Sequence, residues 1–347
     1  MLLGSPGDEE LILDGLQAAL GDATPVLGGS SGDNAVTGAW RQMAKAGTSN
    51  FNVGAPTTSG GGITIAIAWA SCEVATVLTS GFRQTEHRGV VTKVDAADHG
   101  RTILEIDGEP TKAVYERWSE GKIAADVPFD ENGVATVLAP SSFRPLGEPT
   151  GDGHVRVMHP AFLNKHSGAL TTFADAREGM QVVMLDAAPE TMAKKISQSA
   201  KSLVADAMDA SAAAGGSSAK FETKDVVGAL SIFCGGLVMA IDDKMPMAAE
   251  QLAEVLGHNN TMGVCCFGEQ GMDHCRRATH GNLMFGCLLF SNKRRETDKA
   301  QATLTELGDD AGTAKKPAPT PTRAKASAVH VNEVDAMYAE IEKIQVP

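Results

Sequence analysis

The side chains best suited to chemistry lie in one stretch of the chain. Cys234 ends an apolar run beside two glycines, and Gly268 and Glu269 end a second apolar run. His280 and Asn282 follow in a polar loop that precedes a third apolar run. A carboxylate, an imidazole and an amide can orient a small polar molecule, whereas a thiol beside an imidazole can form a nucleophile. This stretch is therefore the candidate site.

Three apolar runs must position these groups, and each is predicted to be a buried strand. They span 227–234, 262–267 and 283–290, with a helical segment between the first two. The three strands converge on two glycine turns and one polar loop. Such a rigid apolar frame with polar groups at its rim is the usual construction of a small-molecule site.

A second glycine-rich corner lies near the start of the chain. A short predicted strand runs directly into a segment that contains Gly28, Gly29, Ser30, Ser31 and Asp33. Successive glycines allow backbone N–H groups to point into one concavity, and such concavities bind anions. The segment lacks the spacing of a P-loop and of a dinucleotide-binding turn. It is predicted to be either an anion-binding turn or a plain tight turn.

A helix is predicted to begin after the turn at Ser5. Its first turn is acidic because it contains Glu9 and Glu10. The positive end of a helix dipole favours acidic side chains there, so the pair has a local explanation.

The strongest N-terminal pattern is a strand pair followed by a helix. Strands are predicted over 88–94 and 101–106, and a helix is predicted over 111–119. Period-two alternation places apolar neighbours on one face of the second strand and Glu105 on the other. Glu105 is therefore either a solvent-exposed residue or a ligand-binding one.

Length and composition predict the domain organisation. The chain has 347 residues, of which 43% are hydrophobic, and its net charge is −13. We expect two α/β domains, 1–150 and 151–295, with mixed, mainly antiparallel sheets flanked by helices. A Pro-rich disordered linker is predicted over 296–331 and an amphipathic helix over 332–346. The negative charge argues against nucleic-acid and anionic-membrane partners.

The six cysteines do not form a disulfide pattern, which predicts free thiols and a cytoplasmic protein. Cys265, Cys266, Cys275 and His280 are close in sequence, but adjacent strand residues face opposite sides and the spacing matches no zinc pattern. We therefore predict no metal and no cofactor. No apolar run approaches the roughly 18 residues of a membrane-spanning helix.

Two of these motifs resemble the N-terminal FIST domain, where FIST stands for F-box and intracellular signal transduction. They are Gly-Gly-Ser-Ser-Gly-Asp at 28–33 and Leu-Glu-Ile-Asp-Gly-Glu-Pro at 104–110, the latter followed by a helix that contains Tyr115. Family members normally carry a further α/β segment ahead of Met1. The resemblance therefore implies that the sequence begins inside a folded unit.

The candidate site resembles the C-terminal FIST domain. The resemblance is carried by Cys234 with its glycine pair, by Phe267-Gly268-Glu269, and by His280 and Asn282 ahead of a final strand. The chain departs from the family in two places. Leu237 stands where the family usually has Arg, and Gly281 separates His280 from Asn282, which are commonly adjacent.

The resemblance implies a non-enzymatic sensory module of signal transduction that binds a small ligand such as an amino acid. The glycine-rich corner would hold a carboxylate, Glu269 an ammonium group, and His280 and Asn282 other polar atoms. The ligand-binding residues predicted from both corners are Gly28, Gly29, Ser30, Ser31, Asp33, Glu105, Cys234, Gly268, Glu269, His280 and Asn282.

Two alternatives stay open. Eukaryotic relatives pair FIST domains with an F-box in ubiquitin ligases. The first alternative is therefore a scaffold or adaptor protein, with a protein partner that binds the helix predicted over 332–346. The other alternative is a thiol-dependent hydrolase in which His280 activates Cys234.

Overall fold

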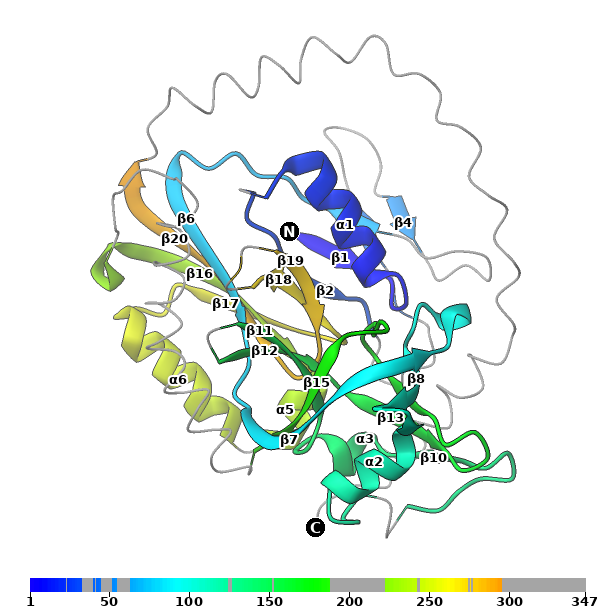
Figure 1. Cartoon of the computed structure of the whole chain (residues 1–347). Helices are drawn as coiled ribbons and strands as arrows, with labels where there is room; N and C mark the ends of the chain where they lie inside the picture. Colours follow the sequence, from blue (N-terminus) through cyan, green and yellow to red (C-terminus); the bar gives the residue numbers. More distant parts are fainter. Residues whose placement is uncertain are drawn as a thin grey trace, which may run out of the picture.

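Three sheets make up most of the protein, which was analysed as a computed structural model (Figure 1). The structure describes residues 1–22, 24–32, 40, 42–44, 52–54, 63–123, 127–151, 153–187, 222–241, 244–273, 275 and 277–294. The predicted linker and C-terminal helix lie outside these residues. Among the helices of the described residues, none has both the length and the apolar character needed to cross a membrane.

A five-stranded sheet joins the start of the chain to its later part. Its strands, in spatial order, are β19 (Ala278–Gly281), β18 (Glu269–Met272), β2 (Leu27–Ser30), β1 (Leu2–Gly4) and β5 (Ile63–Ile65). Helix α1 (Glu9–Leu20) packs on this sheet, because Leu13 of the helix is buried against Leu2, Val26 and Met272.

A nine-stranded antiparallel sheet forms the second unit. Its strands, in spatial order, are β10 (Val134–Thr136), β13 (Pro160–Asn164), β14 (Leu170–Thr172), β8 (Thr102–Ile106), β7 (Arg83–Val94), β15 (Gln181–Asp186), β11 (Leu146–Gly151) and β12 (His154–Met158), with β9 (Glu109–Pro110) paired to β8. Helices α2 (Thr111–Trp118) and α3 (Leu138–Ser141) lie beside it, and the 3₁₀ turn η1 (Ala96–Asp98) joins β7 to β8. The α2 side chains Val114, Tyr115 and Trp118 fill its core.

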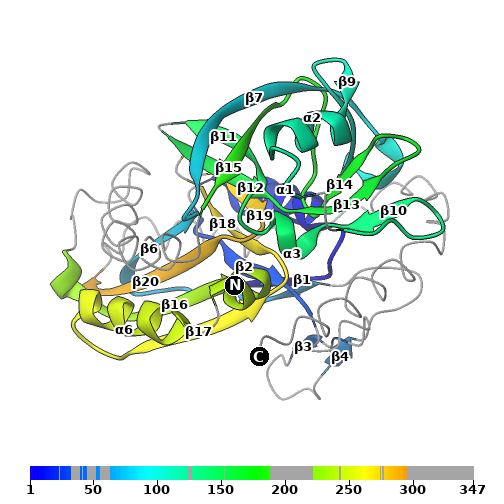
Figure 2. The same cartoon turned by 90° about the horizontal axis from the view of Figure 1, so that it is seen from below.

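A four-stranded sheet carries the three predicted apolar strands, but the prediction of a buried strand is wrong for the run at 262–267, because its strand lies at the sheet edge and is mostly exposed. Its order is β17 (Thr261–Cys266), β16 (Val226–Cys234), β20 (Phe285–Arg294) and β6 (Cys72–Thr79). The 3₁₀ turn η2 (Thr223–Asp225) leads into β16, and a separate strand pair joins β3 (Gln42–Ala44) to β4 (Asn52–Gly54). Helices α5 (Gly235–Ile241) and α6 (Met245–Leu256) cover one face, as Figure 2 shows, through Leu237, Leu252 and Leu256.

The prediction of α/β architecture with mixed, mainly antiparallel sheets is confirmed. Only the β1–β2 and β16–β17 pairs are parallel among the described strands. Each of the three large sheets combines strands from both sides of residue 150. The predicted boundary between 1–150 and 151–295 stays a prediction.

Candidate functional site

The two glycine-rich corners lie side by side in the five-stranded sheet. Strand β2 pairs antiparallel with β18, so that Gly29 faces Glu269 and Gly28 faces Gln270. Beyond the strand, the backbone N–H of Ser30 donates to the Gly268 carbonyl at 2.9 Å. Residues that are more than 230 positions apart therefore share one short strand contact.

The first corner is a buried strand, so the prediction of a turn is wrong for its described part. Gly28 and Gly29 belong to β2, and an added Cβ would overlap the Leu2 carbonyl oxygen at Gly28 and the Cys266 sulfur at Gly29. The N–H of Ser31 donates to the Gly4 carbonyl at 2.8 Å. These glycines serve close strand packing, and the N–H groups of Ser30 and Ser31 are occupied by carbonyl groups. Asp33 lies outside the described residues.

A buried charge cluster lies at the N-terminus of α1, over the β2–β18 contact. Arg101, directly before β8, donates to Glu9 Oε2 at 2.7 Å and to Glu10 Oε2 at 3.2 Å. Its Nε donates to Asp175 at 2.8 Å. The other oxygen of Glu9 accepts from Ser30 Oγ at 2.6 Å. These ion pairs hold the acidic first turn of α1 to the nine-stranded sheet. Because α1 packs on the five-stranded sheet, the ion pairs connect the two sheets.

Arg156 of β12 extends the cluster. Its guanidinium donates to Glu148 at 2.9 Å and to the Asp175 carbonyl at 2.7 Å, and it lies 3.5 Å from Glu10. Arg177 Nη2 donates to Glu148 Oε1, the other carboxylate oxygen, at 2.6 Å. Charged pairs this deep are costly to break, because removing one partner leaves an uncompensated buried charge.

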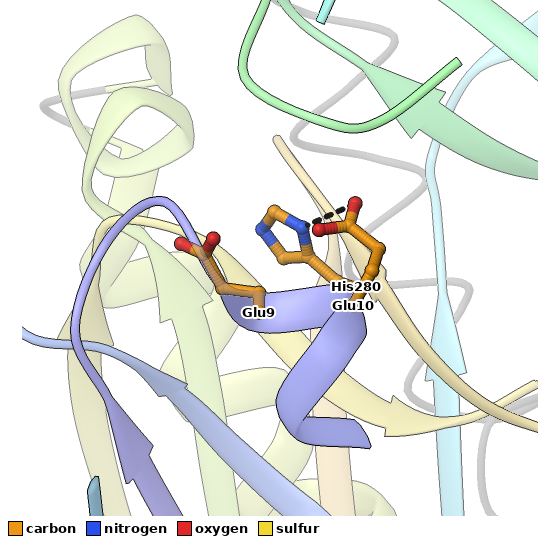
Figure 3. Close-up of side chains that lie close together, drawn as sticks. All are labelled: Glu9, Glu10 and His280. Carbon is orange, nitrogen blue, oxygen red and sulfur yellow. Dashed lines mark hydrogen bonds and ion pairs between the residues drawn. The ribbon is translucent and has the colours of Figure 1, made fainter. Parts of the chain in front are cut away.

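His280 of β19 brings the predicted C-terminal corner into the same cluster. Its Nδ1 donates to Glu10 Oε1 at 3.0 Å, as Figure 3 shows. Its Nε2 is buried and has no hydrogen-bond partner among the described residues. Gly268 lies against this nitrogen, and a Cβ there would stand 2.5 Å from Nε2.

The charges of the cluster lower the pKa values of its buried glutamates and raise the pKa of its histidine. Burial alone would raise the pKa of Glu9, but the charges of His280 and Arg101 lower it. The same balance, led by burial against His280, lowers the pKa of Glu10 well below its usual range. Burial alone would lower the pKa of His280, but the carboxylates of Glu10 and Glu9 raise it.

Glu269 occupies a separate buried pocket on the other face of β18. Its carboxyl group accepts from the Met284 N–H at 2.9 Å and from Cys266 Sγ at 3.5 Å. Burial raises the pKa of Glu269 to about 8. Cys234 is opposite Cys266 in the β16–β17 pair. Glu269 is therefore enclosed by thiols and backbone and does not reach solvent.

Cys234 lies directly before α5, which begins at the glycine pair. Burial and then the charge of Glu269 raise the pKa of Cys234 well above its ordinary value, although the N–H groups of Leu237 and Gly236 act in the other direction. A thiol in this state is a poor nucleophile. His280, the base proposed for it, is hydrogen-bonded to Glu10 instead.

Asn282 fixes the backbone between two sheets. Its Oδ1 accepts from the His159 N–H at 3.1 Å, and its own N–H donates to the Val157 carbonyl at 3.0 Å. His159 in turn contacts the Leu138 carbonyl at 2.9 Å through Nε2. Asn282 thus lies beside the cluster and holds β12 to the end of β19.

Glu105 lies apart from the other predicted residues. It belongs to β8, and its carboxylate is 3.9 Å from Lys93 Nζ at a partly exposed position. Within the part of the chain that the structure describes, no hydrogen bond or ion pair joins it to Glu9, Glu10 or His280.

A small hollow lies next to the cluster. Its cavity volume is about 40 Å³, and its walls include Arg156, Asp273, Thr79 and Thr279. These residues come from β12, the end of β18, β6 and β19, so three sheets contribute. Asp273 is already paired with Arg277 at 3.0 Å.

Sequence reasoning missed Glu9, Glu10, Arg101 and Arg156 as members of one cluster. The acidic pair was fully explained by the helix dipole, and both arginines lie in ordinary strand patterns. The weak signal was the first turn of α1, which has two carboxylates and no basic residue in the same helix to pair with them.

Comparison with known proteins agrees with these motifs. The FIST N domain matches residues 1–109, and the FIST C domain matches residues 113–272. No curated protein and no solved structure gives a significant match. The two domain matches together cover well over half of the chain and include β2, α1 and Glu269, whereas His280 and Asn282 lie beyond the matched residues. The chain therefore belongs to the FIST family.

Proposed function

We propose that this FIST protein is a non-enzymatic sensory module that binds a small amino-acid-like ligand in the hollow beside the charge cluster. The observation that carries the proposal is the presence of residues of opposite charge, Arg156 and Asp273, in its wall. A guanidinium group can bind the carboxylate of an amino acid, and a carboxylate can bind its ammonium group. Thr79 and Thr279 also line the hollow, together with apolar residues such as Leu78 and Met284.

The size of the hollow limits which part of the ligand enters it. A volume of about 40 Å³ is room for about three water molecules. The hollow therefore takes the charged end of the ligand, and the remainder of the molecule lies outside. An amino acid satisfies this condition because both of its charges sit on one carbon atom.

The sensory step follows from the internal partners of the two charges. Arg156 is bonded to Glu148 and lies near Glu10, while Asp273 is bonded to Arg277. A ligand that bonds to Arg156 competes with these partners and changes the contact between α1 and the nine-stranded sheet. Ligand binding thereby changes the stability of this contact between α1 and the nine-stranded sheet. A sensor requires such a link between binding and conformation.

The proposed function is non-enzymatic because Cys234 is not activated as a nucleophile. Its thiol is buried, its pKa is raised, and the imidazole of His280 is hydrogen-bonded to Glu10. These features do not supply a thiolate and a base in contact.

A thermal-shift screen of the full chain against amino acids tests the proposal. A ligand at about 100 times its Kd adds about 2.7 kcal/mol of stability, which raises Tm by several degrees. Thr279→Val keeps the side-chain shape, removes a lining hydroxyl and should weaken the response. Thr136→Val on β10, outside the hollow, is the matched control. A screen in which no amino acid or small polar metabolite shifts Tm contradicts the proposal.

A further inference from the structure

The imidazole of His280 is held as in a metal-binding histidine. Metal-bound histidines generally donate one ring N–H to a carboxylate, which leaves the other nitrogen as an unprotonated ligand. Nδ1 of His280 donates to Glu10 at 3.0 Å. Its Nε2 is buried without a partner and lies on the Glu9 side of the ring (Figure 3). One donor atom each of Glu9, Glu10 and His280 lies within 4.8 Å of the other two.

Gln270 supplies a second unpartnered atom on the same face of the sheet. It is the direct cross-strand neighbour of His280 in the β18–β19 pair, so the two side chains project together. Its Nε2 donates to Ser30 Oγ at 3.1 Å, while Ser30 donates onward to Glu9 at 2.6 Å. This chain fixes the amide orientation, and Oε1 is left buried without a donor.

Glu9 retains capacity for one more partner. A carboxylate has about four acceptor positions. Oε2 takes the Gly7 N–H at 2.8 Å and Arg101 at 2.7 Å, while Oε1 takes only Ser30. The open position is thus on Oε1, the oxygen that Ser30 links to Gln270.

A cation bound at His280 would take the place of a proton. The carboxylates of the cluster are Glu9, Glu10, Glu148 and Asp175, and its guanidiniums are Arg101, Arg156 and Arg177. Glu10 and Glu9 favour a proton on His280, and this proton makes the opposite charges equal in number. A metal ion at Nε2 therefore competes with protonation, and it supplies the positive charge that the proton otherwise supplies.

We propose that His280 Nε2, Glu9 Oε1 and Gln270 Oε1 bind a divalent first-row transition-metal ion, with Glu10 orienting His280 and Ser30 orienting Gln270. One imidazole with two oxygen donors suits Mn²⁺ or Zn²⁺ rather than Ca²⁺ or Mg²⁺. Gly268 keeps the space beside Nε2 clear of a side chain. The site shares neither its ligands nor its ion with the hollow, so it goes beyond the proposed sensing of an amino-acid-like molecule.

Titration of the EDTA-treated full chain with Mn²⁺, followed by electron paramagnetic resonance, tests the proposal. Mn²⁺ avoids the exposed thiols of Cys265 and Cys275, which would capture Zn²⁺. We expect one equivalent to bind. His280→Gln should lower affinity by more than about 100-fold, and Glu10→Gln by about 10- to 100-fold. His166→Gln, at an exposed turn far along the chain, should bind as the wild type does.

A second readout keeps the test decisive if a variant fails to fold. With the proposed ligands unchanged, ¹⁵N spectra of the histidine side chains in a Cys265→Ser, Cys275→Ser chain should show that Zn²⁺ shifts Nε2 of His280. Absence of stoichiometric Mn²⁺ binding, or an unchanged His280 spectrum with Zn²⁺, overturns the metal site. Neither result bears on the amino-acid screen, so the two proposals can fail separately.

Discussion

Glu10 and His280 are 270 residues apart in the chain, yet Nδ1 of the histidine lies 3.0 Å from the carboxylate. The contact joins the first turn of α1 to the edge strand β19, and Arg101 joins the same carboxylate to the nine-stranded sheet. Buried charge therefore holds together the parts of the fold that carry the two glycine-rich corners.

Removal of Arg101 should be among the most destabilising single changes in the chain. Arg101→Met leaves the buried carboxylates of Glu9 and Glu10 without the guanidinium that pairs with both, so we expect a loss of about 3–5 kcal/mol of unfolding free energy. The control is Arg83→Met, because Arg83 pairs with Asp186 at 71% side-chain exposure and should cost less than about 1 kcal/mol. Urea unfolding measures both, and equal losses would contradict the central role of the cluster.

Gly28 should tolerate no side chain. In Gly28→Ala the new Cβ would overlap the Leu2 carbonyl, which is backbone and cannot move aside, so a loss of at least about 2 kcal/mol is expected. Gly15→Ala is the matched control, since a Cβ there meets nothing within 4 Å and alanine is favoured in a helix by about 0.5–1 kcal/mol. The two substitutions should change the unfolding midpoint in opposite directions.

His159 should make the protein less stable in acid. Burial lowers the pKa of His159 to about 4, whereas an unfolded histidine titrates near 6.5. The unfolded state thus binds a proton first, and stability present above pH 6.5 is lost as the pH falls toward 4, by up to about 3 kcal/mol. Unfolding of wild type and His159→Gln from pH 7 to 4 measures the difference. An identical decline in both proteins would contradict the assignment.

Glu269 should make the protein less stable as the pH rises. Its pKa is raised to about 8 by burial, so its stabilising contribution is complete below pH 4.5 and is lost as the pH rises through 8. Glu269→Gln keeps an acceptor for the Met284 N–H and cannot ionise. The variant should therefore gain stability relative to the wild type between pH 6 and 9. A constant difference across this range would show that Glu269 is ionised throughout.

The thiols should divide into two reactivity classes. Cys265 and Cys275 are exposed and Cys72 is half-buried, whereas Cys234, Cys266 and Cys287 are buried. Burial raises the pKa of the three buried thiols and also that of Cys265, so exposure is what separates the classes. Iodoacetamide treatment of the native chain, followed by peptide mass spectrometry, should modify the first two well before the other three. Fast modification of Cys234 would instead favour the thiol hydrolase.

The local sequence predicts strands well where side-chain burial decides the structure. The apolar run 227–234 becomes β16, and alternation predicts β8, because each pattern must bury one face wherever the strand lies. Glycine is less informative by itself. Gly28 and Gly29 fit a turn equally well, and only the approach of Leu2 and Cys266 shows that they serve strand packing.

The sequence by itself determined the FIST motifs, the buried strands β16 and β20 and the mainly antiparallel α/β class, since these depend on local periodicity and on glycine spacing. The tertiary structure alone decided the charge cluster. Glu10, Arg101, Arg156 and His280 come from four segments distant in the chain, and their contacts follow from sheet order. No local pattern encodes an ion pair across elements, because its energy depends on burial and separation that only the folded chain supplies.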